Sequence, residues 1–375
     1  MITQDEKYML KAISLAKRGL GAVEPNPAVG CVIVKANKII GQGWHKKFGA
    51  PHAEINALED CRKKGNSPKG AVMYVTLEPC CHTGKTGPCT KAIIEAGVSK
   101  VFIAIIDPSK YVNGKGIREL CNAGIEVQTG LCRQEAKRLN APFIKYVTTG
   151  RGWVILKWAQ SIDGKLAWTK ESGQRWISGQ QSRRDAHKLR RRASGILVGI
   201  ETVLTDDPEL TARPAKGSKA VRIVLDRQMR IPLDCKLLNM QGPRVFVVTS
   251  KEAVEQKKEL AEKIREKGAE ILVVPVSEDK CDLKVLLEQL SSRGVQQLLV
   301  EGGAEVISSF LKEGLTDECV VYIGPMILGN KGKIDIGTVV SKFGGGIALN
   351  DVDIKRFGED VRITGFSKNL RLNVT

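Results

Sequence analysis

Hydrophobic and polar positions change their spacing repeatedly along the chain, which is typical of alternating helices and strands. A capping box at Thr3 and Glu6 opens an amphipathic pattern that continues to Arg18, so a helix is predicted there. Val29 to Val34 and Lys38 to Trp44 have the pattern of two paired strands joined by a short turn. The chain therefore begins with a helix and a hairpin.

Two further apolar runs, Val72 to Leu77 and Val101 to Ile106, predict buried strands, with helical patterns between the elements. A helical segment starts near Arg133, and a short polar stretch from Thr148 to Gly152 follows it before a new strand begins. We place a domain boundary in this stretch, with domains of residues 1–149 and 150–375. The first domain is predicted to be a layered α/β domain.

The second half also alternates between strands and helices. Its predicted strands are Trp153 to Trp158, Gly195 to Gly199, Val221 to Leu225, Arg244 to Thr249, Ile271 to Val274, Gln297 to Val300, Val320 to Ile323 and Val361 to Thr364. Its predicted helices include Gln180 to Arg192, Lys251 to Lys267 and Leu283 to Ser292. This pattern indicates a second α/β domain that ends in antiparallel strands.

Composition narrows the class of protein. A chain of 375 residues suits two domains, and it contains neither a membrane-spanning apolar run nor the pattern of a signal peptide. We therefore expect a cytoplasmic protein without a membrane partner. Its 10 cysteines are irregularly spaced outside one motif, which favours free thiols over disulfides.

The formal charge of +18 favours anionic ligands without choosing among them. Nucleic acid is one candidate, but aromatic residues make up only 5% of the chain and do not alternate with the basic residues, so a base-stacking surface is not indicated. Phosphorylated small molecules are attracted by the same charge.

The clearest chemical signal lies between His52 and Cys89. His52 is followed two residues later by Glu54, and Cys80 and Cys89 each follow a proline. One imidazole and two thiolates hold one Zn²⁺ and leave a fourth position for water, which the metal makes acidic. Glu54 is then the candidate that carries a proton from that water to the departing amine.

A structural zinc with four protein ligands is the alternative, with Cys81 or His82 as the fourth. Adjacent cysteines rarely both bind one ion in good geometry, and a structural site gives no role to Glu54. We therefore favour catalysis, with Cys81 and His82 as loop residues and His82 near the pocket.

Other motifs are weak when taken alone. Asn26 lies between two prolines, and taken alone it indicates a turn. The segment from Gly114 to Gly116 comes before a predicted helix and fits either a phosphate site or an ordinary turn. Val300 to Ala304 runs from a strand through two glycines into a helix, which fits a pyrophosphate or a tight turn. The polar segment Glu201 to Pro208 follows a strand end, where α/β domains bind ligands.

Over nearly its whole length the chain resembles the bifunctional deaminase/reductases of riboflavin biosynthesis. The matching motifs of the first half are Pro25-Asn26-Pro27-x-Val29-Gly30, Gly43-x-His45, Pro51-His52-Ala53-Glu54 and Glu78-Pro79-Cys80-Cys81-His82-x-Gly84-x-Thr86-x-Pro88-Cys89. Those of the second half are Leu156-Lys157-x-Ala159-x-Ser161-x-Asp163-Gly164, Trp176-Ile177-Ser178, Arg183-Arg184-Asp185, Thr202 to Arg213 and Glu301-Gly302-Gly303.

The resemblance implies a cytidine-deaminase-like three-layer domain followed by a dihydrofolate-reductase-like α/β domain. The first would remove an amine from a diaminopyrimidinone that carries a ribosylamine 5′-phosphate, and the second would reduce the ribosyl group with NADPH. It also implies one Zn²⁺ per chain and a homo-oligomer without a nucleic-acid partner.

Site residues carry over by position. His52, Cys80 and Cys89 match the zinc ligands, and Glu54 matches the proton carrier. Cofactor contacts match Ala159, Trp176, Thr202, Asp206, Arg227, Gly303, Ala304, Glu305, Val306, Ile307, Ser308 and Ser309. Substrate contacts match Asn26, Gln174, Arg190, Leu210, Arg213 and Glu301.

Two positions depart from the family pattern. Gln174 stands for a substrate-binding serine in a loop one residue longer than usual, and Arg227 replaces a small hydroxyl residue. Because Arg227 and Arg230 lie just beyond a strand end, we hypothesise that one of them binds the 2′-phosphate of NADPH. Two other functions stay open, a nucleic-acid deaminase and a deaminase whose reductase domain is inactive.

Overall fold

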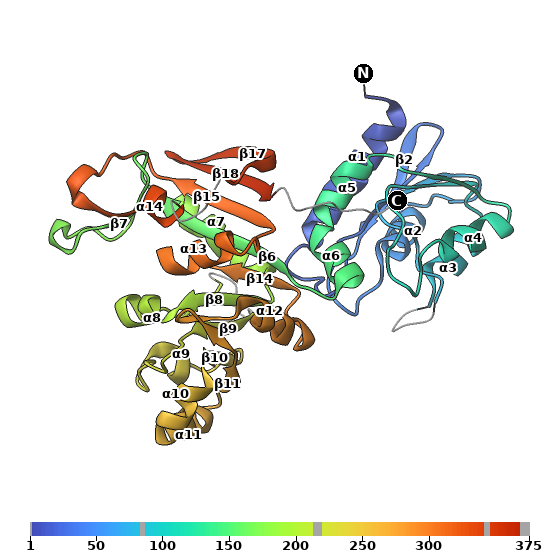
Figure 1. Ribbon diagram of the computed structural model, residues 1–375. Helices are drawn as coiled ribbons and strands as arrows, with labels where there is room; N and C mark the ends of the chain where they lie inside the picture. The colour runs from blue at the N-terminus through green and yellow to red at the C-terminus, as the bar shows by residue number, and fades with distance from the viewer. Residues whose placement is uncertain (1, 83–86, 213–219, 341–345, 368–375) are drawn as a thin grey trace. The chain divides into compact units, whose positions relative to one another are not determined.

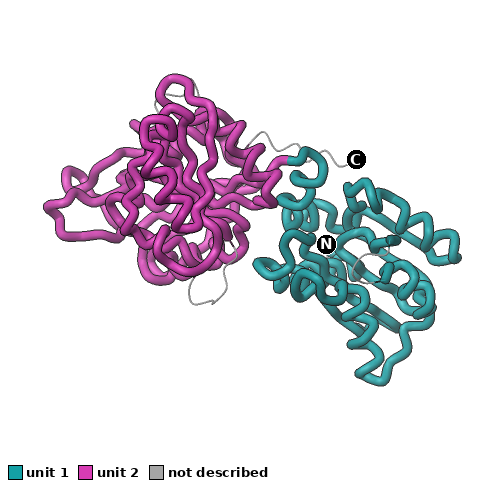
Figure 2. Tube along the Cα trace, turned by 90° about the horizontal axis from the view of Figure 1, so that it is seen from below, with its two compact units in different colours: residues 1–150, 372–375 teal, residues 151–371 magenta. Residues whose placement is uncertain are grey.

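The computed structural model describes residues 2–82, 87–212, 220–340 and 346–367. The chain forms two compact units, one that extends to Gly150 and one that begins at Arg151 (Figure 2). None of the helices in these ranges is long and apolar enough to cross a membrane.

Unit 1 alternates helices and strands around one sheet (Figure 1). Its elements are α1 (Gln4–Ala16), η1 (Lys17–Gly19), β1 (Gly30–Lys35), β2 (Lys38–Trp44), α2 (Ala53–Lys63), β3 (Val72–Val75), α3 (Cys89–Glu95), β4 (Lys100–Ile103), α4 (Lys115–Asn122), β5 (Glu126–Thr129), α5 (Arg133–Leu139) and α6 (Ala141–Thr149). The capping box at Thr3 and Glu6 forms as predicted. The strand order is β2-β1-β3-β4-β5, with β1 antiparallel to both neighbours and β3, β4 and β5 parallel.

Both faces of the unit 1 sheet are buried. Val32, Tyr74 and Phe102 belong to the core that α1, α5 and α6 cover, whereas Ile33 and Met73 point to the opposite core, which α2, α3 and α4 cover. This alternation follows from the two-residue period of a strand. The result is the predicted three-layer α/β domain.

Unit 2 is built on a larger sheet. Its strands are β6 (Trp153–Gln160), β7 (Lys165–Trp168), β8 (Gly195–Gly199), β9 (Val221–Leu225), β10 (Val245–Thr249), β11 (Glu270–Val273), β12 (Val276–Ser277), β13 (Lys280–Cys281), β14 (Gln297–Val300), β15 (Glu318–Ile323), β16 (Gly332–Asp335), β17 (Leu349–Phe357) and β18 (Asp360–Ser367). Its helices are η2 (Lys170–Ser172), α7 (Gln180–Arg192), α8 (Ile200–Asp206), α9 (Lys236–Asn239), α10 (Lys251–Gln256), α11 (Lys258–Glu266), α12 (Leu283–Ser292), α13 (Ala304–Lys312), η3 (Gly329–Lys331) and α14 (Ile336–Val340).

The main sheet of unit 2 has the order β11-β10-β9-β8-β14-β6-β15-β18-β17. From β11 to β15 every neighbouring pair is parallel, and β18 and β17 are antiparallel. Residues on both faces of the central strands are buried, such as Leu298 and Leu299 in β14. Burial on both faces explains why these strands appear in the sequence as continuous apolar runs.

The structure also corrects some sequence predictions. The helix predicted from Lys251 to Lys267 is interrupted at Lys257 and forms α10 and α11. The polar segment after β8, for which no element was predicted, forms the short helix α8. The strand β17 and the small sheets β7–β16 and β12–β13 were not predicted, because their exposed positions lack a clear apolar period.

Candidate active sites

His52, Cys80 and Cys89 converge although 37 residues separate the first from the last. His52 Nδ1 lies 3.5 Å from Cys80 Sγ and 3.3 Å from Cys89 Sγ, and the three ligand atoms are all within 4.8 Å of one another. Tetrahedral zinc with bonds of about 2.0 Å to nitrogen and 2.3 Å to sulfur separates such atoms by roughly 3.5 Å. These three side chains therefore fit a Zn²⁺ ion.

Two of these ligands lie at helix starts. His52 caps α2, and Cys89 is the first residue of α3 after Pro88. A Cβ at Gly43 would lie only 2.4 Å from the backbone nitrogen of Ala57, which shows that α2 packs directly against the backbone of β2. A glycine at this position therefore allows α2 to approach β2 closely, which brings His52 at its start next to the two cysteines.

The pKa values of the two thiols are shifted in opposite directions. Hydrogen bonds from the Cys89 thiol, from His52 and from the Cys89 backbone N–H lower the pKa of Cys80 to about 4 despite its burial. The neighbouring Cys80 and burial raise the pKa of Cys89. A bound cation provides the positive charge that two adjacent thiolates need.

Glu54 is the second residue of α2 and is buried beside the zinc ligands. Burial, and next the negative charge of Cys80, raise the pKa of the Glu54 carboxyl to about 7. A carboxyl that gains and loses a proton near neutral pH can act as both general base and general acid. Glu54 lies outside the set of three converging ligands.

Asn26 and His45 line the same cavity as His52, Cys80 and Glu54. The cavity has a volume of 360 Å³. Asn26 Nδ2 is 3.3 Å from His45 Nε2, and His45 Nδ1 is 3.2 Å from the carbonyl oxygen of Pro51. Because a carbonyl oxygen only accepts, Nδ1 carries the proton and Nε2 accepts from Asn26. Burial lowers the pKa of His45, which keeps the ring neutral and the Asn26 amide oriented.

The glycine-containing segment before α4 holds a carboxylate of the protein itself. Glu78 accepts hydrogen bonds from the backbone N–H groups of Asp107, Gly114 and Ile117 at 3.2, 3.0 and 3.2 Å. A Cβ at Gly116 would lie 2.2 Å from the carbonyl oxygen of Pro79. The amides at the start of α4 are thus satisfied by Glu78, so this segment is a structural turn and not a phosphate site.

The remaining motif residues behave as loop residues. His82 lines the cavity, and Cys81 is not among the described residues that converge as metal ligands. Gly84 and Thr86 lie outside the described residues.

The candidate residues of unit 2 gather at one edge of its sheet. Ala159 is near the end of β6, Glu301 follows β14, Thr202 and Asp206 lie in α8 after β8, and Arg227 follows β9. These four strands are neighbours in the order β9-β8-β14-β6 and run parallel. The carboxyl ends of adjacent parallel strands are where open α/β sheets bind ligands.

Two of the predicted substrate contacts pair with each other. Arg190 donates to both oxygens of Glu301, with Nε–Oε1 and Nη2–Oε2 distances of 2.8 Å, and Lys157 Nζ is 3.9 Å from Oε2. Burial would raise the pKa of Glu301, but the charges of Arg190 and Lys157 outweigh it and lower the pKa to about 2. The Glu301 carboxyl therefore stays ionised at neutral pH, and Lys157, which the sequence analysis quoted in a motif without a role, is its second basic neighbour.

Trp176 is 55% exposed at the rim of this edge. The guanidinium carbons of Arg175 and Arg183 lie 5.0 and 4.8 Å from its ring centroid, and Arg175 also pairs with Asp206 at 3.5 Å. Trp176 and Asp206 are thus linked through one arginine. Gln174 is exposed in the loop before them, where its backbone N–H donates to Ser172.

The backbone at the start of α13 has open space beside it in which a ligand could lie. Gly302 packs on Val306, since a Cβ there would lie 2.4 Å from the Val306 Cβ, whereas a Cβ at Gly303 would have no atom within 4 Å. Gly303 is the N-cap of α13 and has no side chain that could accept from the first backbone N–H groups, which are the groups that bind phosphate at a helix start. This geometry fits the phosphates of NADPH.

The predicted run from Gly303 to Ser309 is not uniform. Val306 and Ile307 are buried in the core of unit 2, so only their backbones remain for a ligand. Ala304, Glu305, Ser308 and Ser309 are less buried. Leu210 is also buried, with a left-handed backbone at a φ of 50°, and Arg213 lies outside the described residues.

Comparison with known proteins decides the family. The sequence model described as "Cytidine and deoxycytidylate deaminase zinc-binding region" matches residues 2–105, and that described as "RibD C-terminal domain" matches residues 152–363. The Riboflavin biosynthesis protein RibD of Aquifex aeolicus is 44% identical over 96% of this chain and 93% of its own length. The chain belongs to the RibD family.

Further RibD proteins agree along nearly the whole chain. RibD of Escherichia coli strain K12 is 40% identical and covers 87% of this chain and 89% of its own. The crystal structure of a Thermotoga maritima deaminase/reductase superposes with a TM-score of 0.81 at 36% identity, covering 97% of this chain and 99% of the other. The structure of Acinetobacter baumannii RibD, form 1, superposes with a TM-score of 0.80 at 36% identity and covers 98% of this chain and 99% of its own. The chain is thus a deaminase and reductase of riboflavin biosynthesis that uses zinc and NADPH.

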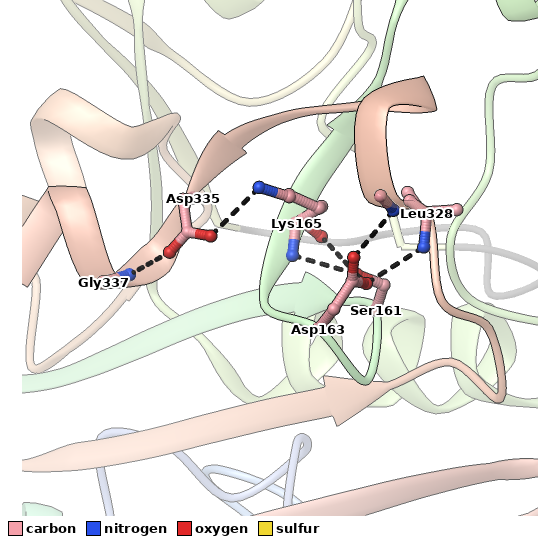
Figure 3. Close-up of polar contacts among 7 residues, drawn as sticks. Ser161, Asp163, Lys165, Leu328, Asp335 and Gly337 are labelled. Atoms are coloured by element: carbon pink, nitrogen blue, oxygen red, sulfur yellow. Dashed lines mark hydrogen bonds and ion pairs between the residues drawn. The ribbon is translucent and has the colours of Figure 1, made fainter.

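One RibD motif, Ser161-x-Asp163-Gly164, has a structural role that the sequence did not reveal. Asp163 accepts from Ser161 Oγ at 2.6 Å and from the backbone N–H groups of Leu328 and Gly329 at 3.0 and 2.8 Å (Figure 3). Lys165 on the same turn pairs with Asp335 at 3.1 Å. We call this set the Asp163 clasp, and it ties the turn after β6 to the segment after β15.

Proposed function

We propose that residues 1–149 deaminate a diaminopyrimidinone ribosylamine 5′-phosphate and that residues 150–375 then reduce its ribosyl group with NADPH. The observation that carries the first step is the convergence of His52, Cys80 and Cys89 beside a cavity that His52, Cys80 and the buried Glu54 line. The similar Thermotoga maritima protein carries a name that combines a deaminase of such a pyrimidine with a reductase of the resulting uracil.

In the deamination, each polar group of the cavity has a separate task. Zinc held by the three ligands would supply a water acidic enough to attack at neutral pH. Glu54 takes the proton of that water and delivers it to the amine, which leaves as ammonia while a carbonyl forms on the ring. Asn26, held by His45, meets the polar edge of the pyrimidinone.

In the reduction, the protein positions two reactants at the carboxyl edge of the sheet. The open start of α13 at Gly303 would receive the cofactor phosphates, and Ala159, Thr202, Asp206 and Trp176 would line the rest. When bound, NADPH would supply a hydride to the sugar carbon bonded to nitrogen, while the bond from that carbon to the sugar ring oxygen breaks and the oxygen takes up a proton. Arg190, with Glu301, would orient the substrate, since a guanidinium is suited to phosphate.

Arg227 and Arg230 keep their proposed role at the 2′-phosphate. In the structure Arg227 pairs with Asp279 at 2.8 Å and Arg230 with Glu201 at 2.6 Å, and Asp279 is 87% exposed. A pair with so exposed a partner is weak, so a phosphate could replace Asp279. Arg227→Ala should reduce the preference for NADPH over NADH, and an unchanged preference in Arg227→Ala and Arg230→Ala would refute the role.

The partners are proposed to be phosphorylated small molecules, in a cytoplasmic homo-oligomer that binds neither nucleic acid nor membranes. The net charge of +18 supports anionic substrates. A nucleic-acid deaminase gains no support, because relatives with both domains match nearly the whole chain.

The decisive experiment follows NADPH oxidation by zinc-loaded protein. It compares the diaminopyrimidinone ribosylamine phosphate with its deaminated product. Oxidation with both substrates supports two steps in series. Deamination without any oxidation would refute the reductase, and oxidation with the deaminated compound alone would refute the deaminase.

A further inference from the structure

The cavity of unit 1 changes from a buried floor to an exposed mouth. Glu54 at the floor is 3% exposed, whereas Phe48 and Tyr111, which also line the cavity, are 43% and 62% exposed. The carbon that loses its amine must approach Glu54 and the zinc ligands. The phosphoribosyl arm of the substrate therefore has to extend towards the mouth.

Tyr111 is presented by an ordered loop. Asp107 accepts from the backbone N–H of Ser109 at 2.8 Å, and Val112 is buried and donates its N–H to the carbonyl of Ser109 at 3.0 Å. Glu78 anchors the beginning of the same loop through the N–H of Asp107. The backbone on both sides of Tyr111 is thus fixed, while its ring stays in solvent at the cavity mouth.

The surroundings of Tyr111 combine an aromatic face with a positive charge. The ring of His82 lies 6.1 Å from it, tilted by 45°, and Lys110 Nζ lies 5.4 Å from the Tyr111 centroid. Within the described parts of the chain, no acidic side chain forms an ion pair with Lys110. An ammonium in this position can pair with a phosphate, and a large aromatic ring can cover the face of a sugar.

We propose that Tyr111 and Lys110 bind the phosphoribosyl end of the deaminase substrate. The Tyr111 ring packs against the sugar, and the Lys110 ammonium pairs with the 5′-phosphate. This inference rests on the deaminase function proposed above, and it assigns to this chain a substrate contact that the motifs did not indicate.

The test measures kcat and KM for deamination by Tyr111→Ala, Tyr111→Phe and Lys110→Ala, with the phosphorylated substrate and its dephosphorylated counterpart. Tyr111→Ala should raise KM about tenfold with kcat within about twofold, and Tyr111→Phe should restore most of the affinity. Lys110→Ala should raise KM about three- to fivefold for the phosphorylated substrate only.

Lys63→Ala is the charge-matched control, because Lys63 is 77% exposed on α2 and neither of its neighbours in the chain lines the cavity, whereas Ser109 and Tyr111 on both sides of Lys110 do. Equal effects of Lys110→Ala and Lys63→Ala, or equal losses with both substrates, would overturn the phosphate contact. An unchanged KM in Tyr111→Ala, at unchanged zinc content, would overturn the sugar contact. If the unaltered protein does not deaminate, the proposed function fails and this inference fails with it.

Discussion

At the residue scale, Glu54 has the environment of a proton carrier. Its pKa is raised to about 7 by burial and by Cys80, and it does not belong to the set of converging ligands. Glu54→Gln should therefore lower the deamination rate by roughly 10²- to 10⁴-fold while zinc stays bound. Metal analysis with a deamination assay checks both parts. Cys81→Ala is the control and should keep its zinc; zinc lost from Glu54→Gln would contradict the assignment.

Glu301 allows a prediction on pH. Its folded pKa of about 2 is below the unfolded value, so the carboxylate stabilises unit 2 above about pH 4.5 and loses this contribution as the pH falls towards 2. Glu301→Gln should be less stable at neutral pH, and its deficit should shrink on acidification by at most about 1.4 kcal/mol per pH unit. Denaturant unfolding from pH 7 to pH 3 measures this, and a constant deficit would argue against the ion pair.

At the element scale, the two glycines before α13 have different roles: Gly302 is needed for packing, and Gly303 is proposed to leave room for a ligand. A Cβ at Gly302 would overlap Val306, so Gly302→Ala should shift the helix and lower stability by about 1–3 kcal/mol. Gly303→Ala has free space and an ordinary φ of −69°, so its stability should be unchanged. If phosphates bind there, Gly303→Ala should raise the KM for NADPH about tenfold. Unchanged KM would place the cofactor elsewhere.

The Asp163 clasp joins two segments that are 165 residues apart in the chain. Asp163→Ala removes the shared acceptor, which should let the turn after β6 move beside Ala159 and lower the reductase kcat/KM by about tenfold. Deamination by the same protein is an internal control and should not change. Ser161→Ala removes only one of the three donors and should have a smaller effect. Equal losses in both activities would indicate general destabilisation instead.

At the scale of the whole molecule, two compact units carry separate chemistry. Removing zinc with a chelator should abolish deamination, while NADPH oxidation with the deaminated substrate should continue at about its normal rate. Zinc added back should restore the first activity. Loss of both activities on chelation would show that the second unit also depends on the metal.

The sequence by itself determined most of the buried elements and the zinc chemistry. The α1 capping box and the strands β8, β9 and β14 follow from local patterns, since a helix cap or an apolar run acts within a few residues. The zinc motif was readable because its ligands have distinctive residue types. The exposed strand β17 could not be predicted, because most of its residues face solvent and its sequence shows no regular alternation of apolar and polar positions.

Only the tertiary structure decided which polar side chains meet. Arg190 and Glu301 are 111 residues apart, and their pairing depends on the order of strands in the sheet. The same holds for Glu78, whose carboxylate occupies the amides before α4 and so excludes a phosphate there. Side-chain hydrogen bonds of this kind depend on distances of about 3 Å, which no spacing along a chain specifies. The folded molecule therefore determines the site's geometry.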